Sequence, residues 1–480
     1  MQTIEAQHFV GGAWQGTPAR RRVNPARPDD LVSVSAEADE ATVDRALASA
    51  NAAQPEWHAM PAPQRGQVLM RAAALLEDRE PEVATDLTRE EGKTLNEAIG
   101  EVRRSISILR FFGSEGWQIG GQTFPSASRD VLIYSRREPM GLVLAITPWN
   151  FPIAIPSWKI APALVAGNAV ILKPAQLTPG TATHLVRALA DAGMPPGVLS
   201  LVLGTGSMIG NRLIDDPRVS ALSFTGSLAV GSQIYERAAR RRIRTQLEMG
   251  GKNAIVVLDD ADPVVAARIA AAGAFGLTGQ ACTATSRVIC QRGVAPALEA
   301  ALEAESRRFL PGDGLEAGVL MGPVVSEDQL EVDRSFLDAA RSDGLRIVAG
   351  EEAPRGLLHP PAIISGVKVT DRLAQEEIFG PVVSLIEVAS LDEAITAVNS
   401  SRYGLVAGIV TSDLGAVQRF ARDARVGVVK VNQPTSGVEL NVPFGGVADS
   451  STNTYRELGS AAVDFCTWTK SVYVNDPGWS

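Results

Sequence analysis

Short apolar runs alternate with amphipathic segments along most of this chain. The runs at 141–146, 169–174, 199–203, 219–224 and 254–258 stop at Gly, Pro, Thr or charged residues, as buried strands do where they enter loops. The stretches between these runs place Ala, Leu and Arg at helical spacing. This alternation predicts βαβ units around a parallel sheet, and therefore an α/β fold class.

The same patterns give approximate element limits. The spacing predicts helices over 41–53, 64–79, 81–120 and 178–192. The second half repeats the strand pattern, with candidates at 287–291, 346–349, 382–388 and 406–411. Two more polar segments, 131–138 and 461–474, have strand character, and the second is predicted to be an edge or intersubunit strand.

Composition narrows the class of protein. The chain has 480 residues, which predicts two or three domains, and 45% of the residues are hydrophobic, which suffices for a large core. The net charge of -9 argues against a nucleic-acid partner. The N-terminus lacks a signal-peptide pattern, and the apolar runs are too interrupted to span a membrane. We therefore expect a cytoplasmic protein without a membrane partner.

One of the three cysteines stands in a polar, glycine-containing context. Cys282 lies in Gly279-Gln-Ala-Cys-Thr283, whereas Cys290 and Cys466 show neither metal-ligand spacing nor a disulfide framework. About thirty residues upstream, Glu248 precedes two glycines. A thiol and a carboxylate in such contexts predict a nucleophile with a general base, and no metal. Taken alone, such a pair is more often a buried structural cysteine and a surface glutamate.

Further polar motifs follow predicted strands. These are Thr147-Pro-Trp-Asn-Phe-Pro152, Lys173-Pro-Ala-Gln176 and Phe224-Thr-Gly-Ser227, and a glycine-rich turn covers 204–210. Ligands of open parallel sheets bind beyond the carboxyl ends of the strands, and a helix N-terminus after Ser227 suits a pyrophosphate. Without further context, Lys173 would be a solvated charge and Asn150 a capped turn.

Together these motifs resemble the aldehyde dehydrogenase family. The resemblance covers essentially the whole chain and also includes Glu248-Met-Gly-Gly-Lys252, Glu377-Ile-Phe-Gly-Pro381, Asn399 with Tyr403-Gly-Leu405, and Pro443-Phe-Gly-Gly446. It implies a Rossmann-type cofactor domain, an α/β catalytic domain and a small β oligomerisation element. The expected bounds are 1–119 with 140–250, 251–460, and 120–139 with 461–480.

The resemblance also implies residue roles. Cys282 would attack the aldehyde carbon, the Asn150 side chain would stabilise the oxyanion, and Glu248 would activate the water that hydrolyses a thioester. Lys159 would lie near these groups. The cofactor, NAD or NADP, would contact Ile146, Thr147, Pro148, Trp149, Lys173, Ala175, Gln176, Gly206, Gly210, Phe224, Thr225, Gly226, Ser227, Glu377 and Phe379.

Two departures from the family's pattern carry expectations. Gln176 stands where many relatives have Glu, and a neutral amide removes the repulsion of a 2′-phosphate, so NADP should be accepted, alone or alongside NAD. After Gly446 the chain reads Val447-Ala-Asp-Ser450, without the lysine common in relatives, so the loop 447–455 is expected to differ in subunit contacts or ordering.

Details around Cys282 and in 430–451 resemble the 2,5-dioxovalerate (α-ketoglutarate semialdehyde) dehydrogenases. An acidic semialdehyde needs a cation or N–H donors at its far end. Arg110 is the candidate cation, with an ion pair to Glu101 or another helix neighbour as the alternative. Phe151 and Phe444 are the other expected substrate contacts.

The expected partners are a small aldehyde and further copies of the chain, as a homodimer or homotetramer. A CoA-acylating semialdehyde dehydrogenase is an alternative, although Glu248 would then lack its purpose. A non-catalytic protein on the same scaffold is a second alternative, which the intact set of Cys282, Glu248 and Asn150 disfavours.

Overall fold

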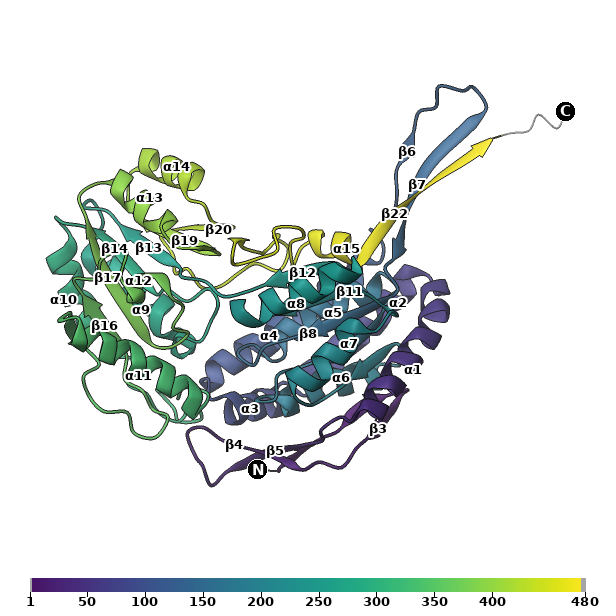
Figure 1. Cartoon of the computed structure of the whole chain (residues 1–480), viewed down its shortest axis with the longest axis horizontal. Helices are drawn as coiled ribbons and strands as arrows, with labels where there is room; N and C mark the ends of the chain where they lie inside the picture. Colours follow the sequence, from purple (N-terminus) through teal and green to yellow (C-terminus); the bar gives the residue numbers. More distant parts are fainter. Residues whose placement is uncertain (1, 476–480) are drawn as a thin grey trace.

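Two seven-stranded sheets organise the protein (Figure 1). The structure, a computed structural model, describes residues 2–475, without the side chains of residues 207 and 208. Residues 476–480 of the expected oligomerisation element therefore lie outside the described part. Within that part, no helix is long and apolar enough to cross a membrane.

The first sheet has the strand order β12-β11-β8-β9-β10-β2-β3. Its strands are β2 (His8–Val10), β3 (Ala13–Gln15), β8 (Leu142–Ile146), β9 (Ala169–Lys173), β10 (Leu199–Leu201), β11 (Val219–Thr225) and β12 (Arg244–Glu248). The five strands from β12 to β10 run parallel, as the continuous apolar runs predict. Its helices are α1 (Glu40–Ala59), α2 (Ala62–Asp78), α3 (Glu80–Glu91), α4 (Leu95–Glu115), α5 (Ala154–Val165), α6 (Pro179–Asp191), α7 (Asn211–Asp215) and α8 (Leu228–Arg241).

The second sheet has the order β15-β16-β17-β14-β13-β19-β20, and only β15 is antiparallel to its neighbour. Its strands are β13 (Ala254–Val257), β14 (Arg287–Gln291), β15 (Arg346–Ala349), β16 (Ala362–Ser365), β17 (Val382–Val388), β19 (Val406–Val410) and β20 (Val428–Val431). The helices of this half are α9 (Pro263–Phe275), α10 (Ala295–Ser306), α11 (Glu327–Ser342), α12 (Arg372–Gln375), α13 (Leu391–Asn399) and α14 (Leu414–Asp423).

A long arm projects from the body (Figure 1). It consists of β6 (Thr123–Phe124), β7 (Val131–Pro139) and β22 (Thr467–Asn475), with β22 antiparallel to β7 over nine residue pairs. The expected strand over 461–474 is partly wrong, because 461–466 form helix α15 (Ala461–Cys466). In that helix Ala462, Val463, Phe465 and Cys466 are all buried, so packing on the body overrides the alternating pattern.

The single helix expected over 81–120 is also wrong. It is divided into α3 and α4, because Gly92 ends α3 in the left-handed conformation with φ 109°. Thr94 then begins α4 with a capping box, in which its side chain accepts from the backbone N–H of Glu97 and the Glu97 carboxylate accepts from Thr94. The break turns Lys93 into the interior, where it pairs with Glu101 at 2.6 Å.

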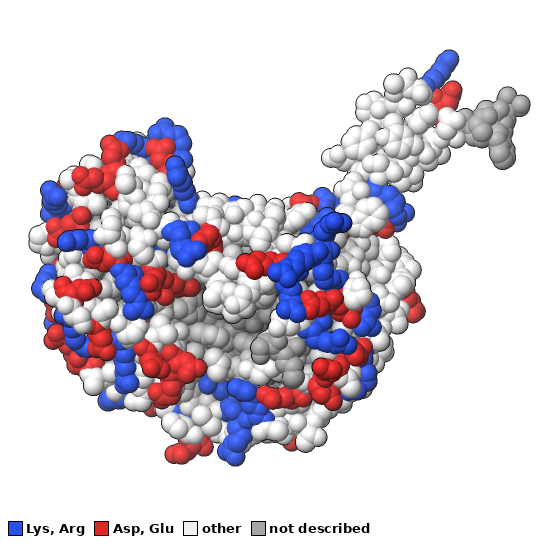
Figure 2. Space-filling view, in the orientation of Figure 1, with Lys and Arg blue, Asp and Glu red and all other residues white. Residues whose placement is uncertain are grey.

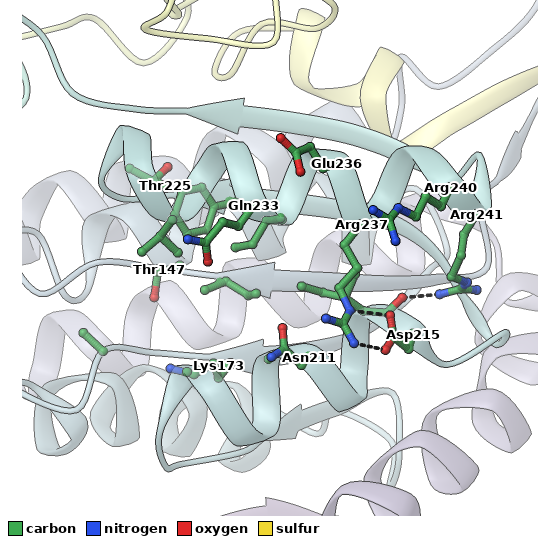
Figure 3. A pocket seen from close by; sticks show the side chains of 18 residues that line it. Thr147, Lys173, Asn211, Asp215, Thr225, Gln233, Glu236, Arg237, Arg240 and Arg241 are labelled. Carbon is green, nitrogen blue, oxygen red and sulfur yellow. Dashed lines mark hydrogen bonds and ion pairs between the residues drawn. The ribbon is translucent and has the colours of Figure 1, made fainter.

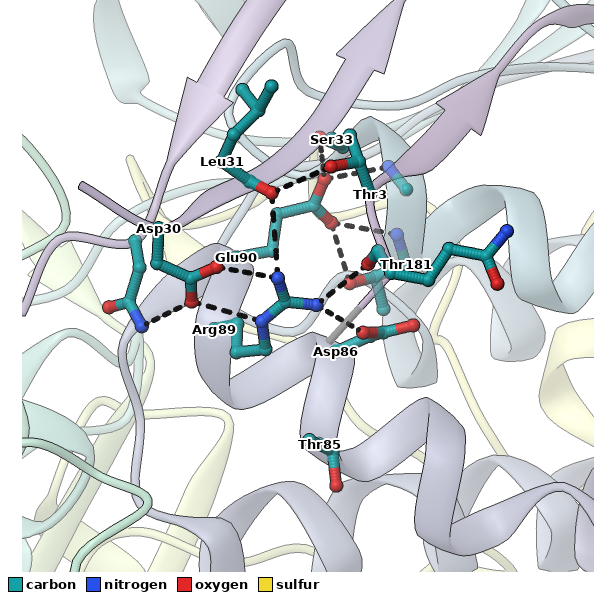
Figure 4. A network of polar contacts seen from close by, with 12 residues as sticks. Thr3, Asp30, Leu31, Ser33, Thr85, Asp86, Arg89, Glu90 and Thr181 are labelled. Carbon is teal, nitrogen blue, oxygen red and sulfur yellow. Dashed lines mark hydrogen bonds and ion pairs between the residues drawn. The ribbon is translucent and has the colours of Figure 1, made fainter. Parts of the chain in front are cut away.

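Near the N-terminus is a three-stranded sheet of β1 (Ile4–Ala6), β5 (Leu31–Ser35) and β4 (Arg20–Val23). Charged residues of α3 connect this sheet to helices α3 and α6 (Figure 4). The Arg89 guanidinium of α3 donates to both carboxylate oxygens of Asp30, at 3.0 and 2.6 Å. Glu90 accepts from the Ser33 hydroxyl at 2.6 Å and from Gly180 N–H at the start of α6, where a carboxylate favours the helix dipole.

Candidate active site

The loop that carries Cys282 is fastened on two sides. It follows a tight turn over Gly276–Gly279, where Thr278 is held at φ 57°. The Asn253 side chain donates to the Cys282 carbonyl oxygen at 2.8 Å, and the Asn150 side chain donates to the Gln280 carbonyl oxygen at 2.9 Å. Asn150 follows β8 of the first sheet, whereas Cys282 precedes β14 of the second. The nucleophile candidate therefore lies where the two sheets meet.

Cys282 lines two cavities that approach it from different sides. One, of about 200 Å³, is also lined by Trp149, Ser227, Glu377 and Phe379. The other, of about 410 Å³, is lined by aromatic and small apolar residues that include Phe151, Trp158 and Phe444. Two different reactants can thus reach the sulfur without competing for the same space.

The Cys282 sulfur is a thiol in this environment. Burial raises its pKa to about 12, and the carboxylates of Glu377, Glu248 and Glu457 add to the shift. Because only a thiolate is a strong nucleophile, the S–H proton must be taken up when a carbon–sulfur bond forms. The S–H proton therefore needs an acceptor, which solvent entering either cavity can supply.

The Asn150 amide can donate a hydrogen bond into the smaller cavity. Its side chain is buried, and its amide nitrogen has two N–H groups. One of them donates to Gln280, which fixes the plane of the amide, and the second remains for a ligand in the 200 Å³ cavity that Asn150 also lines. A fixed donor of this kind stabilises the charge that develops on a carbonyl oxygen under attack.

Glu248, the last residue of β12, is a buried carboxyl group with a raised pKa. Burial is the main cause, and the neighbouring Glu457 carboxylate adds to it. One oxygen accepts from Gly446 N–H at 2.9 Å, while the other is buried without a hydrogen-bond partner among the described residues. A buried carboxyl group with a raised pKa is suited to take and return protons.

The carboxyl group of Glu248 fits because position 445 is a glycine. A Cβ atom there would come within 2.5 Å of Glu248 Oε1, and Gly445 also has a φ of 155°. The unusual loop 447–455 pairs with the end of β12. The carbonyl oxygen of Ser450 accepts from Met249 N–H at 2.8 Å, and Ser451 forms an isolated antiparallel β-bridge with Glu248. The loop that departs from the family's pattern is thus ordered against the end of β12.

Lys159 of α5 lies beneath these groups rather than in a cavity wall. Its ammonium donates to the Ser223 hydroxyl at 2.8 Å and to Glu457 Oε1. Lys159 is thereby the buried cation that balances the two carboxyl groups of Glu457 and Glu248.

A third hollow, of about 840 Å³, extends the smaller cavity along the first sheet, and Thr225 lines both (Figure 3). It lies at the carboxyl ends of β8, β9 and β11. Its wall contains Ile146, Thr147, Lys173, Ala175, Gly206, Gly210, Phe224 and Thr225, all of which the sequence predicts as cofactor contacts. The hydroxyl groups of Thr147 and Thr225 are buried there without a partner among the described residues.

These hollows fit a dinucleotide. Lys173 is buried, and burial lowers its pKa to about 8. Among the groups that the structure describes, its amine donates only to the carbonyl oxygen of the adjacent Pro174, at 3.0 Å. Ser227 caps α8, so the N–H groups of that helix face the junction of the two hollows. Orphaned hydroxyls, a buried amine and a helix N-terminus together suit a phosphate-bearing ligand with ribose hydroxyls.

The smaller cavity supplies the other end of such a ligand's site. Pro148, Trp149, Gly226, Ser227, Glu377 and Phe379, all predicted cofactor contacts, line it with Cys282. The Trp149 and Phe379 rings meet edge to face, with centroids 5.5 Å apart. Glu377 accepts from Gly251 N–H at 2.9 Å, and burial raises its pKa to about 7.

Two predicted contacts lie elsewhere. Gln176 is not among the residues lining the hollows, and its amide nitrogen lies 3.5 Å from the Glu37 carboxylate. Arg110 does not reach a cavity: its guanidinium, 47% exposed, forms an ion pair with Glu77 of α2. The expected substrate role of Arg110 is therefore corrected, because its side of α4 faces α2 and solvent.

Comparisons with known proteins agree with this geometry. The sequence model described as "Aldehyde dehydrogenase family" matches residues 14–472. The chain belongs to the aldehyde dehydrogenase family. It is 43% identical to the "Alpha-ketoglutarate semialdehyde dehydrogenase" of Haloferax volcanii over 98% of this chain and 99% of that protein. It is also 43% identical to the "2,5-dioxopentanoate dehydrogenase" of Saccharolobus solfataricus, over 95% and 96%.

Solved structures show the same fold. A betaine aldehyde dehydrogenase from Staphylococcus aureus, crystallised with NAD⁺, matches with a TM-score of 0.95 and 30% identity over 99% of this chain and 97% of that one. A family aldehyde dehydrogenase from Burkholderia cenocepacia, described as putative, matches with a TM-score of 0.95, 35% identity and 99% coverage of each chain. The predicted α/β class and NAD(P)-dependent oxidoreductase type are thereby confirmed.

Sequence reasoning missed several residues of this aldehyde dehydrogenase site. Glu457 lies just beyond the altered loop, where the family's pattern gave no guide, and Asn253 follows the glycine pair as an ordinary polar residue. Arg104 lines the 410 Å³ cavity, but neighbouring arginines on α4 obscured it. The signal that separates Arg104 from the neighbouring arginines is its place on the same face of α4 as Glu97 and Glu101.

Proposed function

We propose that this aldehyde dehydrogenase oxidises an acidic semialdehyde, with 2,5-dioxopentanoate as the first candidate, to the carboxylic acid. The observation that carries the proposal is the position of Cys282, which lines both the cofactor-side cavity and the 410 Å³ cavity. The names of the relatives at 41–43% identity support the substrate class.

The residues act in a fixed order in this proposal. The Cys282 sulfur bonds to the aldehyde carbon, its proton passes to solvent in the cavity, and Asn150 holds the resulting oxyanion. Bound NAD(P) supplies the acceptor for the hydride that leaves this carbon. The acyl group then remains on Cys282 as a thioester. Glu248 takes a proton from water, the hydroxide adds to the thioester carbon, and the carbon–sulfur bond breaks as the sulfur regains a proton.

A substrate panel tests the proposal. We expect kcat/KM for five-carbon and four-carbon acidic semialdehydes to exceed that for uncharged aldehydes of equal length by at least about tenfold, because a desolvated carboxylate contact is worth more than a methyl contact. Reduced-nicotinamide absorbance measures both rates. Equal kcat/KM for both classes would contradict the substrate class, and no oxidation of any aldehyde would contradict the activity.

The same panel, run with both cofactors, tests cofactor choice. We propose that NADP is used as well as NAD, because Gln176, which follows Ala175 in the wall of the large hollow, carries no charge, and the Glu37 carboxylate beside Gln176 is already paired with Arg20 at 3.1 Å. Arg240 and Arg241 in the wall of the large hollow add positive charge (Figure 3). A preference for NAD of about a thousandfold in kcat/KM, roughly 4 kcal/mol, would contradict this choice.

We also propose that the arm joins copies of the chain. The arm would then be the oligomerisation element of the predicted division, beside a cofactor domain and a catalytic domain. In the view of Figure 2 the charged side chains of the arm gather at its tip and its base, with an uncharged stretch between them, and Leu132, Tyr473 and Val474 are large exposed hydrophobic residues. Leu132 and Val474 are directly opposite each other on β7 and β22. An exposed apolar ribbon of this kind is typical of an association surface.

Charges placed on the arm should therefore dissociate the oligomer. We expect Leu132→Asp combined with Val474→Asp to lower the mass measured by light scattering after gel filtration, toward that of the monomer. Leu414→Asp is the matched control, because Leu414 is similarly exposed at the start of α14 in the other half of the molecule. An unchanged mass for the arm variant, or the same loss for the control, would contradict the role of the arm.

A further inference from the structure

The cavity on the substrate side of Cys282 contains a single cationic residue, Arg104 of α4. The other side chains that line this 410 Å³ space include the rings of Phe151, Trp158 and Phe444 and the carboxylates of Glu97 and Glu101. Most of the residues that line the cavity are apolar, so Arg104 is partly desolvated there, and an anion that reaches it can form charge-assisted, bidentate hydrogen bonds.

The two carboxylates of this wall have partners already. Glu101 pairs with Lys93 at 2.6 Å and accepts from Ile153 N–H at 3.0 Å. Glu97 closes the capping box at the start of α4 and accepts from Leu277 N–H at 2.6 Å. Neither carboxylate is therefore positioned to neutralise Arg104. Both instead connect α4 to neighbouring segments through hydrogen bonds.

Arg104 has no such tie. It forms no hydrogen bond and no ion pair with the residues that the structure describes. The negative charge that acts on its guanidinium is the Glu439 carboxylate, which follows the cavity-lining residues Gly437 and Val438. Burial lowers its pKa from the usual value, although the guanidinium remains charged at any physiological pH. A half-buried guanidinium without a partner is a binding group for an anion.

The helical face explains why this arginine, and not its neighbours, points into the cavity. Glu97, Gly100, Glu101 and Arg104 follow the i, i+3, i+4 spacing of one helix face, and all four line the cavity. A Cβ atom at Gly100 would meet nothing within 4 Å, so there is open space one turn before Arg104. Arg103, by contrast, pairs with Glu80 at 2.9 Å and is 67% exposed.

We propose that Arg104 binds the carboxylate at the far end of the substrate while the aldehyde carbon lies at Cys282. This assignment rests on the proposed function, because it presumes an aldehyde bound in this cavity, and it makes Arg104 the residue that selects acidic over uncharged aldehydes. Phe151, Trp158 and Phe444 enclose the carbon chain between the two ends.

Steady-state kinetics of Arg104→Gln and Arg104→Lys test the assignment. For Arg104→Gln we expect KM for an acidic semialdehyde to rise about 30- to 100-fold, since a charge-assisted hydrogen-bond pair is lost, while kcat/KM for an uncharged aldehyde of equal length changes less than about threefold. Arg104→Lys keeps the charge without the fork and should fall between wild type and Arg104→Gln. Arg103→Gln, on the solvent side of the same turn, is the matched control and should behave as wild type.

The outcomes separate this assignment from the proposed function. If wild type prefers acidic semialdehydes and Arg104→Gln keeps that preference, the role of Arg104 is overturned and the substrate class stands. Equal losses on both aldehydes, with a lowered melting temperature, would show a structural role and also overturn it. If wild type oxidises aldehydes without preferring acidic ones, the substrate class and the assignment both fail, while the family activity stands.

Discussion

Replacement of Cys282 by alanine is expected to abolish aldehyde oxidation, with a fall in kcat of at least about 10⁴-fold, because covalent catalysis loses its only nucleophile at the junction of the two cavities. NAD(P) binding should be retained, since the dinucleotide contacts lie on the first sheet and around Glu377. Steady-state rates and cofactor titration by fluorescence quenching measure the two effects.

Cys466→Ala is the control for this prediction. Burial raises the pKa of the Cys466 thiol to about 12, as it does for Cys282. Cys466, however, ends α15 at the base of the arm and lines none of the three hollows described above. This variant should keep the wild-type rate. A serine at 282 that left turnover intact would contradict the nucleophile, because an alkoxide is far harder to form than a thiolate.

Glu248→Gln is expected to separate the two halves of the reaction. The first turnover should reduce about one equivalent of cofactor, after which the steady-state rate should fall about 10²- to 10⁴-fold, because water no longer has a general base. Stopped-flow absorbance measures the burst and the following rate. The burst itself is an internal control, because it shows that Cys282 and the cofactor site remain intact.

The raised pKa of Glu248 gives this step a defined pH dependence. Burial and the Glu457 carboxylate favour the protonated form of Glu248, and only the ionised form can accept a proton from water. Hydrolysis of the thioester should therefore slow as the pH falls through this raised pKa and quicken above it. Loss of the burst along with the steady-state rate in Glu248→Gln would contradict a role confined to hydrolysis.

The sequence predicts the strands of both sheets well because a buried parallel strand is a continuous apolar run. The runs at 141–146 and 219–224 correspond to β8 and β11, which carry the cofactor loops. The division of α3 from α4 at Gly92 was missed, although a glycine followed by Thr94 and Glu97 is a recognisable stop and start. The helix over 461–466 could not be predicted, because it depends on contacts with the body.

Sequence motifs locate the site residues that stand in loops directly before or after strands, such as Cys282 and Asn150. They do not locate groups whose role depends on which face of a helix meets a cavity. Arg104 and Arg110 are six residues apart on α4, yet Arg104 lines the 410 Å³ cavity and Arg110 pairs with Glu77. Glu457 likewise enters the site from a distant segment, through its contact with Lys159.

The most direct test of the central claim is to identify the acyl-enzyme. Glu248→Gln is mixed with aldehyde and oxidised cofactor, quenched in acid, digested and analysed by mass spectrometry. The account predicts that the peptide containing Cys282 gains the mass of the aldehyde less two hydrogens, and only when cofactor is present. An unmodified Cys282 beside accumulating reduced cofactor, or the same adduct on Cys290 or Cys466, would contradict it.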